Sequence, residues 1–437
     1  MESFVDRETA LKYIDNAFAT LQDKKSLLRT PIIDFYGIGG IGKTFLLKKV
    51  QQRCQDEQLH CIWVDASEGI SNILHKVIHQ VQQYSITLPF EDRDTNSLSE
   101  FISAMKILLK RGPVVMLFDS IDTSDKEQLS WLETLLRDLS DDNNLFVVLT
   151  SKRALSFEND RSLARKLTLF PLRPFDRPGC EAYLNTIGNQ IETEIRDSIF
   201  LWTRGYPLAL NVMVQAVTSG LDPRKDQDQK EIITYLIDQV LNRSVLARVD
   251  LKERDRYQTV LSLLSIPRHF NLIVMEDLIK KFTPDLALAN SLEYFGLPRE
   301  INQTTEVLDW NATGIGFSVD APVRAILSVK LKIEQPEMYY AAHRLLAQTN
   351  KKWAIEVSGA DSIRYLREYL YHSGCSEDTA TLPQLFASML QQITQRSPES
   401  LQQFASEFSQ DEELREVLGE NFETLSSLIE NNSLSEG

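Results

Sequence analysis

Short apolar runs alternate with longer amphipathic stretches along residues 1–175 of the chain. The apolar runs lie at residues 31–36, 60–65, 113–119, 145–150 and 167–172, and the stretches between them, such as 44–55, have helical periodicity. Buried strands separated by amphipathic helices are typical of a parallel sheet, because a helix connects strands that run in the same direction. The pattern predicts a doubly wound α/β domain over residues 1–175.

Helical patterns replace the strand pattern after Pro174. Residues 177–188, 192–203 and 207–217 each have an apolar face at helical spacing. These segments predict a small helical lid over residues 176–229. Its last part, residues 219–229, is polar and rich in turn-forming residues, which indicates a linker.

The second half of the chain is predominantly helical in pattern, with one interruption. Residues 307–310 and 316–319 alternate apolar and polar side chains around the turn-forming residues 311–314, which indicates a hairpin. Helices followed by a hairpin predict a winged-helix domain over residues 230–335. Residues 336–437 are predicted to be all-helical, with helices at 338–353, 362–371, 382–393 and 412–429 and a frayed tail at 431–437.

Composition narrows the classes of partner. A net charge of −15 disfavours broad nucleic-acid binding, which needs many cationic contacts to phosphate. The net negative charge is concentrated in residues 376–437, which contain twelve acids against Arg396 and Arg415. This segment fits either a docking surface for a protein partner or a solvated helical face. The apolar runs are far shorter than the roughly 20 residues of a membrane helix. The start of the chain is acidic where a signal peptide would be apolar. We therefore expect a cytoplasmic protein with no membrane contact.

The segment Gly37-Ile38-Gly39-Gly40-Ile41-Gly42-Lys43-Thr44 has the spacing of a phosphate-binding loop between a strand and a helix. Its glycines allow backbone N–H groups to turn toward phosphate oxygens, and the positive end of the following helix points at the same anion. Lys43 is expected to bridge the β- and γ-phosphates, and the Thr44 hydroxyl to bind Mg²⁺. The predicted cofactors are ATP or ADP with Mg²⁺. The residues expected to contact the nucleotide here are Gly37, Gly39, Gly40, Ile41, Gly42, Lys43, Thr44 and Phe45.

A carboxylate at the end of a neighbouring buried strand should complete the magnesium site, because Mg²⁺ prefers oxygen ligands. Asp119 follows the apolar run 113–118 and is assigned this role. For Asp122 two interpretations remain open: a general base that polarises the attacking water, or a cap for the next helix.

The run 145–150 ends in Thr150-Ser151-Lys152-Arg153, on the side of the sheet where the γ-phosphate should lie. One of the two cations is expected to sense that phosphate, and Arg153 is included among the candidate catalytic residues with Lys43, Asp119 and Asp122. The sequence does not rank Lys152 against Arg153, and an ordinary solvated pair is the alternative.

Several short motifs follow one another in a characteristic order. They are Phe4-Val5-Asp6-Arg7-Glu8, the phosphate loop, residues 117–122, residues 149–153, and Gly205-Tyr206-Pro207-Leu208-Ala209-Leu210. The ordered set resembles the STAND class of signal-transduction ATPases, which includes the NB-ARC and NACHT families and is related to AAA+ ATPases. The resemblance covers about residues 1–330. It implies that Pro207 packs on the adenine with Leu208 beside it, and that Val5 and Arg7 line the base or ribose.

The resemblance also implies a function. Proteins of this class have an ADP-bound closed form and an ATP-bound open form that self-associates, and slow hydrolysis resets the switch. Effector or sensor chains are then the expected protein partners, in signalling, transcriptional control or defence against phage. Two departures stand out: Val319 lies where NB-ARC relatives often carry a phosphate-contacting histidine, and Ser120 replaces the second acid that follows Asp119 in many relatives.

Two other functions fit part of the pattern. An AAA+ ATPase of the origin-binding or transposition-helper type would share the core and use a lid arginine, such as Arg196 or Arg204, on the γ-phosphate. The Gly205-Tyr206-Pro207 motif favours the switch over this alternative. The third function, a scaffold that keeps nucleotide as a structural ligand, is disfavoured by the intact Lys43, Thr44 and Asp119.

Overall fold

The computed structural model describes residues 5–23, 25–84, 98–158, 160–187, 191–311, 316–376, 381–396 and 400–434. Phe4 of the first motif, residues 312–314 of the predicted hairpin turn and residues 435–437 of the tail lie outside them. The chain divides into two compact units, Met1–Gly220 and Leu221–Gly437, which are described separately. Within the described residues, every helix is too short or too polar to span a lipid bilayer.

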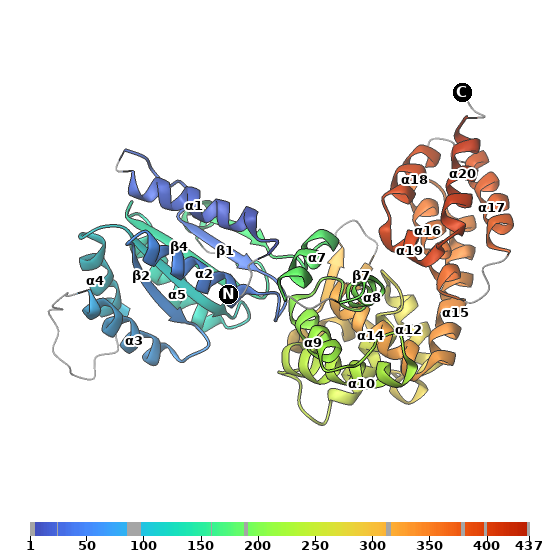
Figure 1. The fold of residues 1–437 in the computed structure, drawn as a ribbon, viewed down its shortest axis with the longest axis horizontal. Helices are drawn as coiled ribbons and strands as arrows, with labels where there is room; N and C mark the ends of the chain where they lie inside the picture. The colour runs from blue at the N-terminus through green and yellow to red at the C-terminus, as the bar shows by residue number, and fades with distance from the viewer. Residues whose placement is uncertain are drawn as a thin grey trace. The chain divides into compact units, whose positions relative to one another are not determined.

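The first unit is built on a five-stranded parallel sheet with the strand order β2-β3-β4-β1-β5 (Figure 1). The strands are β1 (Ile32–Tyr36), β2 (His60–Asp65), β3 (Val114–Ile121), β4 (Leu145–Ser151) and β5 (Leu167–Pro171). Each occurs where the apolar runs predicted it, with ends that differ by two residues at most. The central strands β3 and β4 are buried along almost their whole length, as expected for a sheet covered by helices.

Helices cover both faces of this sheet. Met116 and Phe118 of β3 share a core with Phe101 of α4 and Trp131 of α5. Successive strand residues point to opposite faces, so Val115 and Leu117 face the other layer, which contains α2. From β1 the chain crosses the sheet to β2 at one edge, and it then adds β3 and β4 back toward β1. Because crossovers between parallel strands are right-handed, this change in the direction of strand addition places helices on both faces. The helices of this region are α1 (Glu8–Gln22), α2 (Lys43–Asp56), α3 (Ile70–Gln83), α4 (Leu98–Leu109), α5 (Lys126–Leu139) and α6 (Arg161–Lys166).

Three further helices of the first unit occupy the segment predicted to be a lid, and they are called the lid helices: α7 (Arg177–Thr186), α8 (Thr193–Thr203) and α9 (Pro207–Thr218). The Asp176 side chain accepts a hydrogen bond from the Gly179 backbone N–H and so caps the start of α7. Pro207 is the first residue of α9, a position that tolerates proline because no helical hydrogen bond uses that N–H. Because of these local signals, both helices begin at the residues predicted from the sequence.

In the described residues of the second unit, the regular elements are helices and one antiparallel hairpin between β6 (Leu308–Asn311) and β7 (Gly316–Val319). Phe270, from the loop before α12, pairs with Phe317 through two backbone hydrogen bonds of 2.8 Å and thereby extends the hairpin. The helices before and after the hairpin are α10 (Asp226–Leu236), the π-helix η1 (Ile237–Val245), α11 (Arg254–Leu264), α12 (Leu272–Phe282), the short 3₁₀ turns η2 (Pro284–Leu286) and η3 (Glu293–Phe295), α13 (Leu297–Thr305) and α14 (Ala321–Glu334).

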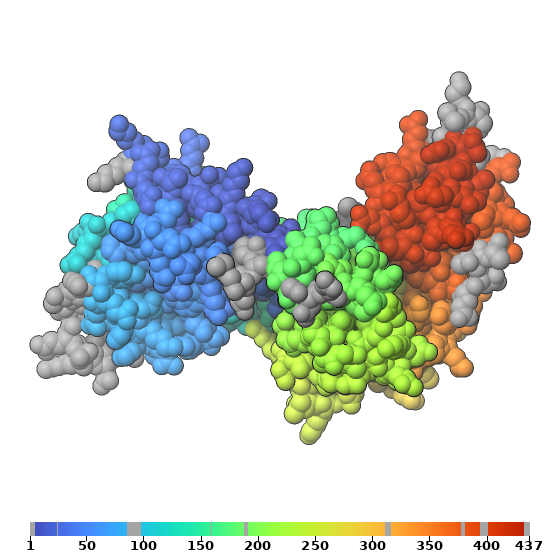
Figure 2. Space-filling model, in the orientation of Figure 1, coloured from blue at the N-terminus to red at the C-terminus, as the bar shows by residue number. Residues whose placement is uncertain are grey.

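The C-terminal helices form a block with its own apolar core, orange to red in Figure 2. They are α15 (Pro336–Glu356), α16 (Ala360–Cys375), α17 (Leu382–Arg396), α18 (Ser400–Ser409), α19 (Glu412–Leu418) and α20 (Asn421–Leu434). The single helix predicted over residues 412–429 is wrong. Gly419 has a φ of +53° and breaks the pattern into α19 and α20, because glycine readily ends a helix in the left-handed conformation. The tail is also more helical than predicted, since α20 continues to Leu434.

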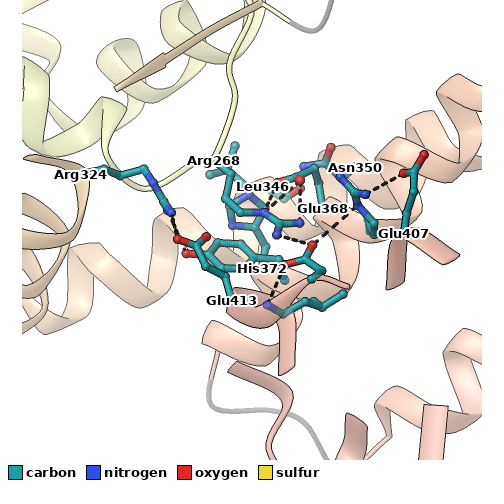
Figure 3. Close-up of polar contacts among 12 residues, drawn as sticks. Arg268, Arg324, Leu346, Asn350, Glu368, His372, Glu407 and Glu413 are labelled. Atoms are coloured by element: carbon teal, nitrogen blue, oxygen red, sulfur yellow. Dashed lines mark hydrogen bonds and ion pairs between the residues drawn. The ribbon is translucent and has the colours of Figure 1, made fainter. Parts of the chain in front are cut away.

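Buried ion pairs join this block to the preceding helices of the same unit (Figure 3). Arg268 contacts Glu368 of α16 at 2.8 Å and Asp411 at 2.6 Å, and all three side chains are nearly inaccessible. Arg324 of α14 pairs with Glu413 of α19 and donates a hydrogen bond of 3.2 Å to the Tyr371 hydroxyl. Buried charges are costly to leave unpaired, so the loss of one partner should destabilise the contact between these helices.

Replacing Arg268 by alanine should destabilise the protein by about 3–5 kcal/mol, because Glu368 and Asp411 would remain buried without their cation. Urea unfolding of the Arg268→Ala variant measures this loss. Lys352→Ala is the matched control: its partner Glu356 lies 3.8 Å away in an exposed pair, which contributes less than about 1 kcal/mol. Equal midpoints for the two variants would show that the buried pairs add nothing to stability.

Candidate functional site

The phosphate loop lies between β1 and α2, and its lysine is held inside the loop. Gly42 precedes α2 with a φ of 101°, a conformation suited to glycine. The Lys43 ammonium group donates hydrogen bonds to the carbonyl oxygens of Gly37 at 2.6 Å and Ile38 at 2.9 Å. The charge therefore lies within the curve of backbone where a phosphate group is expected to bind.

The carboxylate of Asp119 lies against the start of α2. Its Oδ1 accepts hydrogen bonds from the Thr44 hydroxyl at 3.1 Å and from the Thr150 hydroxyl at 2.8 Å. The expectation that Asp119 follows a strand adjacent to β1 is wrong, because β4 lies between β1 and β3. Thr150 lies on this intervening strand. The groups still meet, since the carboxyl ends of parallel strands share one edge of the sheet.

Thr44 and Asp119 present the hydroxyl and carboxylate oxygens that a magnesium ion prefers, so the residues present fit such an ion. No group of three or more His, Cys, Asp or Glu side chains in the described part of the chain is arranged to hold a metal. Magnesium bound here would therefore need phosphate oxygens and water as its other ligands. In that case the metal would neutralise phosphate charge, and Thr44 and Asp119 would hold it in place.

A cavity of about 500 Å³ lies between the phosphate loop and the lid. Its walls combine loop backbone with apolar side chains, the usual composition of a small-molecule pocket. The expected residues that line it are Val5, Arg7, Gly40, Ile41, Gly42, Phe45, Pro207 and Leu208. Sequence reasoning missed the other lining residues, which are Phe175, Tyr183, Thr186, Ile187 and Asn211. These come from the segment after β5 and from lid helices, whose helical patterns do not show which face meets the loop.

The lid rests directly on the phosphate loop. The buried Tyr206 side chain donates a hydrogen bond from its hydroxyl to the Gly39 carbonyl oxygen. A Cβ atom at Gly40 would lie 2.7 Å from the Tyr206 hydroxyl and 2.8 Å from Leu208 Cβ, so only glycine permits this approach. Lid and loop are thus in direct contact beside the cavity.

Gly205 joins the lid to the segment after β5. Its φ is +72°, and a Cβ atom there would lie 1.9 Å from the Phe175 carbonyl oxygen. The two backbones are also hydrogen-bonded, from the Phe175 N–H to the Gly205 carbonyl at 2.9 Å. The glycine of the Gly205-Tyr206-Pro207 motif is therefore required by a close backbone contact.

Arg7 is buried and ties the N-terminal segment to the site. It donates hydrogen bonds to the carbonyl oxygens of Ile41 at 3.2 Å and Arg173 at 3.0 Å, and its guanidinium lies 4.8 Å from the centre of the Phe175 ring. Burial lowers the pKa of Arg7, while neighbouring Asp6 and Glu8 act in the opposite direction. Arg7 therefore lines the cavity and also contacts two other lining residues, Ile41 and Phe175.

The remaining predicted residues lie after β3 and β4. Asp122 Oδ1 accepts hydrogen bonds from the Ser124 N–H at 2.9 Å and the Ser124 hydroxyl at 2.6 Å. The residue that caps α5 is Asp125, so Asp122 is not the helix cap. Arg153 is exposed and Lys152 half-buried, and both follow the carboxyl end of β4.

Asp34, in the middle of β1, has no role in the sequence analysis, although a single acid in an apolar strand is a visible signal. It is fully buried, and burial raises its pKa to about 6. Both carboxyl oxygens lie 2.8 Å from the Ser151 hydroxyl, and Oδ2 accepts a 2.9 Å hydrogen bond from the Leu155 N–H. The acid therefore contacts the turn that carries Lys152 and Arg153.

One comparison with known protein families matches part of the first unit. Residues 29–156 match the protein family described as an AAA domain. The match includes the phosphate loop, Asp119 and the end of β4. Together with the loop geometry it supports a P-loop NTPase core. No curated protein sequence matches this chain.

The comparison with solved structures gives matches of low identity, with TM-scores below 0.5. The ORC1 protein of Aeropyrum pernix, solved in complex with DNA, is 16% identical, with a TM-score of 0.39 over 77% of this chain and 94% of that one. The ORC2 protein of the same organism, solved as ADPNP and ADP complexes, is 13% identical, with a TM-score of 0.44 over 77% and 97%. A STAND protein with a tetratricopeptide repeat sensor, from Pyrococcus horikoshii, is 15% identical, with a TM-score of 0.37 over 99% and 58%.

Replacing Gly205 by alanine should destabilise the first unit by clearly more than the about 1–2 kcal/mol that a left-handed conformation costs alanine, because the added Cβ would collide with Phe175. Gly220→Ala is the matched control, since Gly220 also has a positive φ but has open space around it. Thermal unfolding of both variants makes the comparison. Equal melting temperatures would show that the close contact at Phe175 is not a constraint.

Asp34 should make stability depend on pH in a direction opposite to most acids. Its pKa rises from 3.8 to about 6 on folding, so the folded state binds the proton more tightly. This contribution is complete below about pH 4 and is lost as the pH rises through about 6, by up to about 3 kcal/mol. Unfolding of wild type and Asp34→Asn at pH 4 and pH 7 measures it. The stability of Asp34→Asn relative to wild type should increase as the pH rises. An equal difference in stability at pH 4 and pH 7 would contradict the assignment.

Proposed function

We propose that this chain is a nucleotide-gated switch of the STAND class, which binds ATP or ADP with Mg²⁺ in its first unit and hydrolyses ATP slowly. The observation that carries the proposal is the cavity shared by the phosphate loop and the lid. A nucleotide with its phosphates at Lys43 and its base beside Pro207 would touch both walls. Its phosphate content would then bias the position of the lid through differential affinity.

The polar residues support handling of a magnesium nucleotide. Lys43 lies within the loop, and Thr44 and Asp119 are 3.1 Å apart at the edge of the sheet. Binding of a phosphate group would give the Lys43 ammonium a charged partner in place of two carbonyl oxygens, a stronger type of hydrogen bond. These contacts support a role for the three residues in binding and, for Asp119, in holding the metal.

Slow hydrolysis is consistent with the state of Asp122. A general base must reach the attacking water, but one oxygen of Asp122 accepts two hydrogen bonds from Ser124. Because Ser124 occupies this oxygen, turnover should be limited by the release of Asp122 from Ser124. The role of base thus stays a proposal, as does the sensing of the γ-phosphate by Lys152 or Arg153.

The second unit would carry the response. Helices α11 to α13 followed by the β6–β7 hairpin support a winged-helix module, and the C-terminal block offers a surface for effector or sensor chains. The net charge of −15 disfavours nucleic acid as the main partner. Self-association in the ATP form is part of the proposal.

The first experiment is to extract and identify the nucleotide from freshly purified protein, then measure its mass in solution with Mg²⁺ and either ADP or a non-hydrolysable ATP analogue. Retained ADP on a monomer that assembles with the analogue supports the switch. An empty site with rapid turnover stimulated by DNA would instead support the DNA-associated ATPase.

The Lys43→Ala variant should lose nucleotide retention, because the phosphates would lack their central positive charge. Lys49→Ala is the control: this lysine lies on the same helix and is exposed. Equilibrium binding of ATP and ADP to both variants tests the site. A Lys43→Ala protein that binds ATP as tightly as wild type would refute the assignment of the loop.

A further inference from the structure

The turn after β4 contains one serine hydroxyl that faces more acceptors than it can satisfy. Ser151 Oγ lies 2.8 Å from each carboxyl oxygen of Asp34 and 2.6 Å from the carbonyl oxygen of Arg153. A serine hydroxyl has a single hydrogen, so it can donate to the acid or to the carbonyl but not fully to both. One further proton is needed to satisfy every contact in the turn.

That proton can reside on Asp34. In the protonated form the Asp34 carboxyl donates to Ser151 Oγ, and the Ser151 hydrogen is free to donate to the Arg153 carbonyl. In the ionised form Ser151 donates to Asp34, and the Arg153 carbonyl loses this donor. In both forms the Leu155 N–H donates to Asp34 over 2.9 Å, so the far end of the turn stays attached.

Few other charges affect this proton. The nearest partners of Asp34 across the sheet are Leu149 of β4 and Leu169 of β5, which are apolar. Among the described residues, Lys43 of α2 is the charged group that acts on Asp34, and it favours the ionised form. Burial acts more strongly and in the opposite direction. The acid that holds the turn is therefore coupled electrostatically to the lysine of the phosphate loop.

We propose that Asp34 is a positioning residue for the turn 151–155, and that it sets how strongly the site prefers ATP over ADP. The inference rests on the proposed function. Lys152 and Arg153 lie inside this turn, and one of them is expected to meet a γ-phosphate. A turn attached at both ends holds them in place, whereas a turn that has lost the Arg153 tether leaves them less well ordered. ADP has no γ-phosphate, so its binding should be insensitive to the turn.

The test is the ratio of ATP to ADP affinity in three variants. Asp34→Ala and Ser151→Ala each break the chain of hydrogen bonds and should reduce this ratio by about tenfold while ADP affinity is unchanged. The double variant should be no worse than either single one, because both remove the same chain. Ser151→Ala alone decides the matter if Asp34→Ala fails to fold.

The Asp34→Asn variant distinguishes a role in positioning the turn from a general loss of structure on mutation. Its amide can donate to Ser151 Oγ and accept from the Leu155 N–H, as the protonated acid does. This variant should keep the preference for ATP and make it independent of the protonation of Asp34. In wild type the ratio should rise, relative to Asp34→Asn, as the pH falls from about 8 to 5.5 through the titration of the acid. Because both proteins bind the same nucleotide, the comparison with Asp34→Asn also cancels the effect of the nucleotide's own titration.

Asp142→Asn is the matched control. Asp142 accepts a backbone hydrogen bond from Asn144 at the opposite end of β4, and its replacement should leave the ratio unchanged. A Ser151→Ala variant with the wild-type ratio overturns the inference, as does a wild-type ratio with the same pH dependence as Asp34→Asn. A wild-type protein that binds neither nucleotide would instead refute the proposed function.

Discussion

The contact between lid and phosphate loop is the constraint on which the rest of the site depends. Tyr206 donates to the Gly39 carbonyl, and the missing side chain of Gly205 lets the lid backbone approach Phe175. Without this approach the cavity would lose the wall that Pro207, Leu208 and Asn211 supply. The Tyr206–Gly39 contact and the close approach at Gly205 therefore place the lid and the phosphate loop around one cavity.

Buried polar groups serve different purposes in the two units. In the first unit Asp34 and Asp119 each organise hydroxyl groups at the carboxyl edge of the sheet, where a phosphate is expected. In the second unit Arg268 and Arg324 are neutralised by acids from later helices, and these pairs align the C-terminal block. The burial of a charge is tolerated in both units because each charged group has specific partners.

Much of the fold was predictable from local pattern. The five strands and the three lid helices occur close to their predicted ends, since long apolar runs and helical periodicity are set by the need to bury one face of each element. The helix break at Gly419 was missed because one glycine in a helical pattern does not reveal which conformation it will take. The insertion of β4 between β1 and β3 was missed because a run of strands does not specify their order.

The sequence by itself determined the residues of the candidate site: a glycine-rich loop with Lys43 and Thr44, an acid at Asp119, and a Gly-Tyr-Pro segment further along the chain. These follow from residue types and spacing, which are local. Only the tertiary structure decided that Phe175, Tyr183 and Asn211 join the cavity wall, and that Asp34 contacts Ser151 across 117 positions of sequence. Such contacts depend on which faces of distant elements meet, and that is settled by packing of the whole unit.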